Sequence, residues 1–188
     1  MIEGRITYFE SSGAENTDAV LEIVGKRAKE LDVKKIVIAS RTGDTAVKAV
    51  MALEGFKLVV VSHSTGFDSP DVQKFSVDNR KIVESKGGVI LTMTHVFAGI
   101  HRAMRTKFNT HVTGDVMSNT LRIFGQGMKV ACEIAMMAAD GGLVRTDEDI
   151  ISIGGTRYGA DTAILLKPLN SHQFFDLRIR EILCKPRF

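Results

Sequence analysis

The sequence predicts a single three-layer α/β/α domain in which helices cover both faces of a mostly parallel sheet. Two observations lead to this fold class. Short apolar runs, typical of fully buried strands, occur at 36–39, 58–61 and 89–92. Helix-compatible segments at 45–53 and 72–86 separate them. Strands that alternate with helices indicate crossover connections and therefore a parallel sheet.

The remaining elements extend the same pattern. A first helix is expected over 17–31, where Asn16-Thr17-Asp18 offers capping side chains. A long helix is expected over 118–139, and it should be central because it is apolar nearly all round from Val130 onward. Further strands are expected at 150–153 and 161–166, with a closing helix at 174–183.

The composition indicates a globular protein with a substantial apolar core. Of the 188 residues, 44% are hydrophobic and 25% are charged, and the net charge of +3 is too small to indicate nucleic-acid or anionic-membrane binding. The longest apolar stretch, near 130–139, contains Glu133 and is shorter than the roughly 18 residues of a membrane span. The N-terminus lacks a signal-peptide pattern, and Cys132 and Cys184 lie far apart. We therefore expect a cytoplasmic protein without a disulfide framework or metal site.

Polar side chains follow the first predicted strand, at the edge where open α/β sheets bind ligands. The segment Ser40-Arg41-Thr42-Gly43-Asp44-Thr45 leads directly into a helix. Hydroxyl groups, a glycine and free N–H groups at a helix N-terminus suit a phosphate, and Arg41 adds positive charge. The alternative is an ordinary turn that Asp44 or Thr42 caps. The spacing of a Walker loop is missing.

Histidines follow the second and third predicted strands. His63 precedes Ser64, and His95 follows Thr94. Because parallel strands end at the same edge of a sheet, both imidazoles are expected in one crevice, where they could donate to a ligand or move protons near neutral pH. The alternative is that each is a hydrogen-bonded loop residue. No third metal ligand is nearby, and we interpret the other histidines, His101, His111 and His172, as surface or structural residues.

Two glycine-containing segments complete the candidate site. Gly154-Gly155-Thr156-Arg157 lies in a turn between two predicted strands, where glycine allows either close approach to a ligand or positive φ in a hairpin. Gly125-Gln126-Gly127 lies inside the predicted long helix, where each glycine costs about 1 kcal/mol relative to alanine. Close packing, a kink or a ligand should offset that cost. Lys129 and Glu133 follow at i, i+4 spacing, as a helical ion pair or as a partly buried pair at a pocket.

Residues 28–46 resemble the C-terminal domain of pyruvate kinase. They combine a helix, a strand and a hydroxyl-rich turn that opens a second helix. In many pyruvate kinases this loop cradles the phosphate of a sugar-phosphate effector. The resemblance therefore implies a phosphate-binding role for Ser40, Thr42, Gly43 and Thr45.

Nearly the whole chain resembles the stand-alone pyruvate kinase C-terminal-like proteins of archaea and some bacteria. The segments that carry this resemblance are Tyr8-Phe9-Glu10, Glu15-Asn16-Thr17, His63-Ser64-Thr65-Gly66-Phe67, Thr120-Leu121-Arg122, Gly125-Gln126-Gly127-Met128-Lys129-Val130, 133–140, Gly154-Gly155-Thr156, 159–163 and Phe175-Asp176-Leu177. The resemblance implies a mixed sheet with a final antiparallel strand, an association with flavin mononucleotide (FMN), and a homo-oligomer. We expect no catalytic barrel, so kinase activity is not carried over.

The first hypothesis is therefore that the chain is an FMN-binding protein. One version of this hypothesis makes it an oxidoreductase. The FMN phosphate would lie on the 40–45 turn or the 154–159 turn, and His63, His95 and 125–127 are candidates to line the isoalloxazine ring. The alternative is a non-catalytic sensor of a phosphorylated metabolite, by analogy with the effector role in pyruvate kinase. A third hypothesis, a hydrolase or lyase with a histidine base, lacks a supporting nucleophile, because Cys132 is expected in the core.

Overall fold

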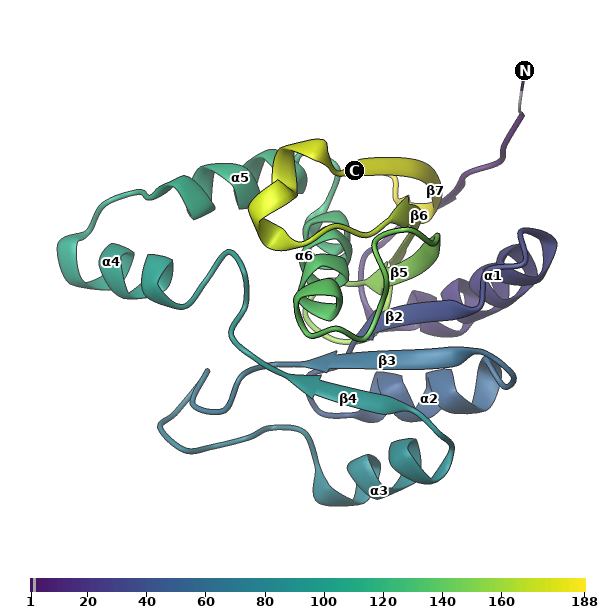
Figure 1. Ribbon diagram of the computed structural model, residues 1–188, viewed down its shortest axis with the longest axis horizontal. Helices are drawn as coiled ribbons and strands as arrows, with labels where there is room; N and C mark the ends of the chain where they lie inside the picture. The colour runs from purple at the N-terminus through teal and green to yellow at the C-terminus, as the bar shows by residue number, and fades with distance from the viewer. Residues whose placement is uncertain (2) are drawn as a thin grey trace.

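The computed structural model describes residues 1 and 3–188, and a seven-stranded sheet forms its middle layer (Figure 1). The strands are β1 (Thr7–Phe9), β2 (Lys35–Ala39), β3 (Lys57–Ser62), β4 (Val89–Thr92), β5 (Ile150–Gly154), β6 (Thr162–Lys167) and β7 (Arg178–Pro186). Their order across the sheet is β1-β7-β6-β5-β2-β3-β4. Only β6 runs against the others, because it pairs antiparallel with both β5 and β7 while every other pairing is parallel. The predicted mixed, mostly parallel sheet is confirmed, but the expectation of a final antiparallel strand is wrong, because the reversed strand is β6 and not the final strand β7.

Helices cover both faces of this sheet. One face carries α1 (Thr17–Glu30), α2 (Asp44–Ala52) and α3 (Val77–Ser85), and the opposite face carries α6 (Gln126–Asp140) (Figure 1). Each face has its own apolar core, the first around α1 and α2 and the second around α6. The three-layer α/β/α architecture is therefore confirmed.

The central strands are buried on both faces, which explains their unbroken apolar sequences. Ile36, Val37 and Ile38 are fully buried, and in the register of β2 and β3 Ile38 lies opposite Val60. Helix α1 instead buries one stripe, since its core residues recur at helical spacing. Its predicted cap is absent: Asn16 makes no capping bond and donates instead to the carbonyl oxygen of Ser11.

The prediction of one long helix over 118–139 is wrong, because two helices occupy that region. Helix α5 (Thr113–Arg122) ends before Gly125, and α6 begins after it. Gly125 has φ of 115°, a conformation outside the right-handed helix that glycine adopts readily. The second glycine, Gly127, packs directly on the start of β6, where a Cβ would overlap the side chains of Asp161 and Thr162. The cost of the two glycines is therefore offset by the break between α5 and α6 at Gly125 and by the close packing of Gly127 on β6.

The closing helix predicted over 174–183 is also wrong. A short 3-10 helix, η2 (Ser171–Asp176), is followed by the strand β7. The position of β7 in the sheet explains the difference, because β7 gains backbone hydrogen bonds from β6 on one side and from the edge strand β1 on the other. The helix predicted over 72–86 is shorter than expected, since it starts after Ser76, whose hydroxyl accepts from the N–H of Asn79 at 3.1 Å.

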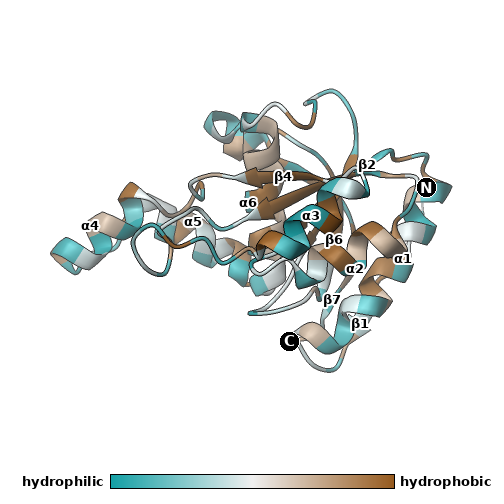
Figure 2. Ribbon diagram, turned by 90° about the horizontal axis from the view of Figure 1, so that it is seen from below, coloured by the Kyte–Doolittle hydropathy of each residue, from teal (hydrophilic) through white to brown (hydrophobic). Residues whose placement is uncertain are grey.

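A helix that the sequence did not reveal, α4 (Ile100–Phe108), lies at the tip of an arm that extends away from the sheet (Figures 1 and 2). It has no buried residue, and it packs against α5. Ile100, Met104 and Phe108 are exposed at intervals of four residues and form one apolar stripe. Within the described part of the chain, no helix is long and apolar enough to cross a bilayer.

Candidate functional site

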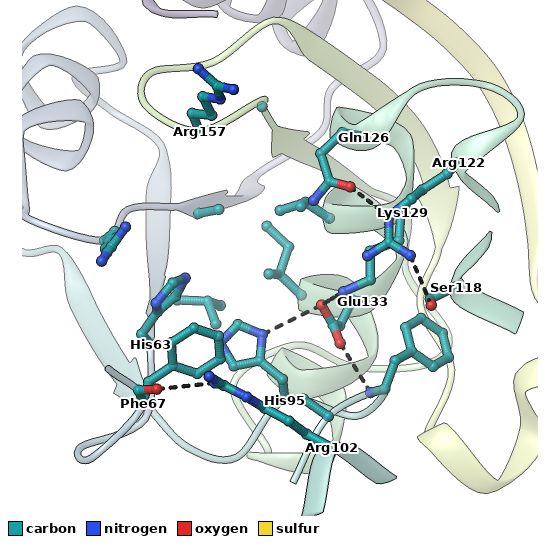
Figure 3. Close-up of a pocket in the computed structure, with 18 of the residues that line it drawn as sticks. His63, Phe67, His95, Arg102, Ser118, Arg122, Gln126, Lys129, Glu133 and Arg157 are labelled. Carbon is teal, nitrogen blue, oxygen red and sulfur yellow. Dashed lines mark hydrogen bonds and ion pairs between the residues drawn. The ribbon is translucent and has the colours of Figure 1, made fainter. Parts of the chain in front are cut away.

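A pocket of about 610 Å³ opens at the carboxyl ends of the central parallel strands (Figure 3). Strand β2 continues to β3 and β4 on one side, whereas β5 lies on its other side, so the topology switches at this point. Ligands of open α/β sheets bind at such switch points. The side chains come from four sources: the loops after β2, β3 and β4, the N-terminal half of α6, the α4–α5 arm, and the turn after β5.

A buried group of three ionisable side chains lies at the pocket floor. Glu133 of α6 is 1% exposed, and Lys129, one helical turn earlier, forms an ion pair with its Oε2. Nδ1 of His95 lies 3.4 Å from the same oxygen. The other carboxylate oxygen accepts the backbone N–H of Phe97 at 3.0 Å (Figure 3). The Glu133 carboxylate thereby joins helix α6 to the loop after β4.

The protonation of this group follows from its contacts. Burial alone would raise the pKa of Glu133, but the hydrogen bond from His95 and the charge of Lys129 outweigh it and lower that pKa to about 2. Glu133 is therefore anionic at neutral pH and can only accept, so Nδ1 of His95 carries the proton it donates. Nε2 of His95 is buried and has no hydrogen-bond partner among the described residues.

An aromatic wall lies beside this group. The ring centroid of His63 is 4.2 Å from that of Phe67 and 5.0 Å from that of His95. The Arg102 guanidinium covers Phe67 at 4.7 Å from the ring centroid and donates to its carbonyl oxygen at 3.0 Å (Figure 3). Burial first, then the neighbouring side chains of His95 and Arg41, lower the pKa of His63 to about 4, so His63 is neutral at pH 7. Its Nδ1 is also buried without a partner within residues 1 and 3–188.

The pocket lining is strongly basic. Six basic side chains line it, Arg41, Arg102, Arg105, Arg122, Lys129 and Arg157, against two acidic ones, Asp115 and Glu133. Arg105 pairs with Asp115 and Lys129 with Glu133, so both acids are already neutralised. Among the described residues, Arg122 donates only to neutral groups, which are the side chains of Gln126, Ser118 and Asn119. Arg157 contacts no hydrogen-bond acceptor in the described structure, and Figure 3 shows it on the turn after β5. The pocket thus carries positive charge that its own carboxylates leave uncompensated.

The turn after β2 is already tied to its own neighbours. The Thr42 hydroxyl donates to the Asp44 carboxylate at 2.7 Å, and the Ser40 hydroxyl accepts the N–H of Ala46 at 3.3 Å. Arg41 pairs with Asp68 at 2.7 Å. Asp44 lies in the first turn of α2, so a negative charge already sits at this helix N-terminus.

Gly43, in the same turn, has φ of 100°, and a Cβ there would overlap Asn79 of α3. Packing between α2 and α3 therefore requires glycine at this position. Thr45 is nearly buried and lies on the pocket wall.

The glycine-rich turn after β5 is held from within the fold. The buried Asp161 carboxylate accepts the N–H of Gly13 at 3.1 Å and that of Thr156 at 3.0 Å. A Cβ on Gly154 would overlap the carbonyl oxygen of Gly127, and one on Gly155 would overlap the turn's own backbone. These two glycines therefore serve close packing of the chain on itself.

The N-terminus of α6 differs from that of α2. No acidic side chain lies in its first turn, and Gly125, its N-cap, supplies no capping side chain. The pocket beside it is lined by Arg122, Gln126 and Lys129. Exposed N–H groups and the helix dipole add to the positive charge of these side chains.

Comparison with known proteins places the chain in a family. The family model described as pyruvate kinase, alpha/beta domain, matches residues 18–166. The chain belongs to this family.

Solved structures to which the chain shows some similarity include a pyruvate kinase from Cryptosporidium parvum, with 12% identity, a TM-score of 0.41, and coverage of 81% of this chain and 23% of that one. Cryptosporidium parvum pyruvate kinase in complex with ADP gives 13% identity, a TM-score of 0.37, and coverage of 79% and 22%. A mutant O-ureido-L-serine synthase with O-ureido-L-serine bound gives 17% identity, a TM-score of 0.32, and coverage of 69% and 48%. The chain spans less than a quarter of the length of these pyruvate kinases.

Most of the predicted site residues of this pyruvate kinase alpha/beta domain lie around one pocket. Those that line it are Ser40, Arg41, Thr42, Thr45, His63, His95, Gln126, Lys129, Gly155 and Arg157. Ser64 and Thr94 line an adjoining cavity that shares Phe67, His95 and Arg102 with the first. The others, Gly43, Asp44, Gly125, Gly127, Gly154 and Thr156, line neither cavity.

The arm supplies residues that the sequence interpretation missed. They are Arg102, Arg105, His111, Asp115, Ser118, Asn119 and Arg122. One signal was present: residues 95–114 contain several basic side chains and no acidic one. That basic segment contributes Arg102 and Arg105 to the pocket lining, beside the loops after β3 and β4.

Proposed function

We propose that the pocket binds a phosphorylated small molecule with a planar ring, and that this molecule is FMN. One observation carries the proposal: six basic side chains surround the pocket, and its two carboxylates are already paired with two of them. An anionic ligand would compensate the remaining charge. The volume of about 610 Å³ lies within the usual range for cofactor-sized ligands.

The phosphate is proposed to bind beside the N-terminus of α6. Within the described part of the chain, Arg122 beside this N-terminus and Arg157 on the turn after β5 pair with no carboxylate, and Gln126 adds an amide. The competing turn after β2 has Asp44 in the first helical turn, and Arg41 is already paired with Asp68. The balance of charge therefore favours α6 as the phosphate subsite.

The ring is proposed to lie against His63, Phe67 and His95. These residues fit a flavin ring in one respect, because their rings form an aromatic wall with centroids 4.2 to 5.4 Å apart. Two imidazole nitrogens, Nδ1 of His63 and Nε2 of His95, are buried without partners among the described residues, so the wall is offered to a ligand as ring surface rather than as hydrogen-bonding groups. A bound flavin would supply reversible two-electron chemistry at this wall.

Equilibrium titration with FMN tests the proposal, followed by absorption and flavin fluorescence. Replacing Arg122 and Arg157 with glutamine should weaken FMN binding at least tenfold, since a charged hydrogen bond contributes about 1.5–3 kcal/mol. Arg80→Gln is the matched control, because Arg80 lies on α3 and pairs there with Glu84 at 3.2 Å. Wild-type protein that gives no saturable signal would refute FMN binding.

The turn after β2 provides the contrasting variant. Replacing Thr42 and Thr45 together with valine should change FMN affinity less than the double arginine variant does, because the Thr42 hydroxyl already donates to Asp44. A larger loss in the threonine variant would move the phosphate to the β2 turn, with the fold checked by circular dichroism.

A sensor of a phosphorylated metabolite is the second candidate. The hydroxyls of Ser40, Thr42 and Thr45 on the pocket wall favour a sugar phosphate as well as FMN. A sugar phosphate at 100 times its Kd should raise the free energy of unfolding by about 2.7 kcal/mol. Stabilisation by sugar phosphates, without any response to FMN, would support the sensor instead.

A homo-oligomer stays a proposal, supported by the apolar stripe of Ile100, Met104 and Phe108 on α4. Sedimentation equilibrium of the wild-type chain and of a Phe108→Ser variant tests it. A wild-type monomer at all concentrations would contradict it. The cytoplasmic location and the lack of nucleic-acid and membrane partners remain predictions from composition.

A further inference from the structure

A second cavity, of about 630 Å³, lies between α4 and the loops after β3 and β4, beside the first pocket. The α4 residues that line it include Arg102, Ala103, Thr106 and Lys107, which recur at helical spacing and therefore form one face of the helix. All four are exposed. The space between this helix face and the loops is therefore open to a ligand.

Contacts on three sides hold α4 in place around this cavity. A Cβ on Gly99 would overlap the Thr94 side chain, so the start of the helix packs directly on the loop after β4. Arg102 donates to the carbonyl oxygen of Phe67 in the loop after β3, at 3.0 Å (Figure 3). Arg105, on another face of the helix, pairs with a carboxylate of α5. These contacts fix the walls relative to one another, so the cavity is part of the fold.

The lining of the second cavity is polar and positively charged. Arg102 and Lys107 are cations, and among the described residues no acidic side chain lines the cavity. In the same part of the chain Lys107 forms no ion pair, and Arg102 uses only Nη1 in a hydrogen bond, to a neutral carbonyl group. The hydroxyl groups of Ser64, Thr94 and Thr106 lie on the same lining. Two uncompensated cations beside hydroxyl donors suit an anion that also accepts hydrogen bonds.

We infer that this cavity binds a small organic acid with two carboxylates, and that the acid binds beside the ligand of the first pocket rather than in its place. A guanidinium group matches a carboxylate through two parallel hydrogen bonds, and Nε and Nη2 of Arg102 are available for them. Lys107 supplies a second positive charge for the other carboxylate. The acid joins α4 to the loops, and it lies next to the first pocket because Phe67, His95 and Arg102 line both cavities.

The two sites can be removed one at a time. Lys107 lines the second cavity and not the first, whereas Arg122 and Arg157 line the first and not the second. Lys107 also forms no hydrogen bond or ion pair with another described residue, so Lys107→Gln should leave the fold unchanged. The inference does not depend on FMN, since it rests on the second cavity alone.

Isothermal titration calorimetry with succinate, at constant ionic strength and without added FMN, tests the inference. Succinate carries two carboxylates, and succinamide is the neutral molecule of similar size. We expect saturable binding of succinate and no binding of succinamide. Arg102→Gln and Lys107→Gln should each weaken succinate binding about tenfold, because each removes a charged hydrogen bond. Lys29→Gln is the matched control, since Lys29 is an exposed lysine of α1 outside both cavities.

Each result supports or overturns the inference. A wild type that shows no saturable heat with succinate overturns it, and so does Lys107→Gln that binds succinate as tightly as the wild type. Succinate binding that is lost in the glutamine variant of Arg122 and Arg157, but kept in Lys107→Gln, moves the acid to the first pocket. Inorganic phosphate that binds as tightly as succinate, with the same dependence on Lys107, overturns the carboxylate class. Because no FMN is added, a failure of FMN binding is a separate result and produces none of these outcomes.

Discussion

Replacing Glu133 with glutamine should destabilise the protein strongly at neutral pH and much less in acid. The folded pKa of Glu133 is about 2, against 4.5 for the unperturbed group. The difference of 2.5 units corresponds to about 3 kcal/mol of stability. Because the folded pKa is lowered, this contribution is present above pH 4.5 and is lost as the pH falls from 4.5 toward 2. At pH 3 about 1 kcal/mol of it remains.

The variant also leaves Lys129 buried, at 8% exposure, without a counter-charge. Breaking a buried pair from one side costs about 3–5 kcal/mol, so we expect Glu133→Gln to lose about that much at pH 7. Urea unfolding followed by circular dichroism at pH 7 and pH 3 measures the difference between wild type and variant. That difference should shrink by about 2 kcal/mol at pH 3.

Glu84→Gln removes one partner of an exposed i, i+4 pair on α3 and serves as the control, with an expected cost of about 0.5 kcal/mol or less. An equal difference between wild type and Glu133→Gln at both pH values would refute the reasoning, because it would mean that Glu133 is not an ionised, paired group in the folded state.

Three further outcomes follow from individual contacts. Gly154→Ala should destabilise by about 2–3 kcal/mol in urea unfolding, because the added Cβ overlaps the carbonyl oxygen of Gly127; an unchanged midpoint would contradict this. Burial, then neighbouring positive charge, lower the pKa of His63 from 6.5 to about 4, so the unfolded chain binds an extra proton between these values and wild-type stability should fall by about 2–3 kcal/mol from pH 7 to pH 4. His63→Asn should reduce that fall, and an equal fall in both proteins would argue against the lowered pKa. Burial raises the pKa of Cys132 and Cys184 to about 12, so neither thiol should react with a thiol reagent until urea unfolds the chain, and rapid labelling of the native protein would contradict their burial.

The central sheet could be predicted because its strands are buried on both faces. Runs such as Ile36–Ala39 have no exposed face, so their sequence is apolar without interruption. Strand β7, next to the edge strand β1, gave a weaker pattern, because Arg178 and Arg180 are exposed. The segment becomes a strand because β6 and β1 supply its pairing. Pairing partners distant in sequence leave no local pattern. The same reason explains the incorrect helix over 174–183.

The candidate site could be predicted in part. The rule that parallel strands end at one edge correctly brought Ser40, His63 and His95 to one pocket. Arg102 and Arg122 were missed because α4 buries nothing and α5 buries only a few residues, so burial leaves little apolar periodicity that would place the arm. The role of Gly125 depended on its φ value, which a sequence does not state.

The most direct test of the account is the absorption spectrum of the purified chain, followed by equilibrium titration with FMN. We expect flavin bands in the protein as purified, or saturable FMN binding that the glutamine variant of Arg122 and Arg157 weakens at least tenfold. A protein without flavin bands, whose absorption and fluorescence do not respond to added FMN, would contradict the proposal that this basic pocket holds a flavin.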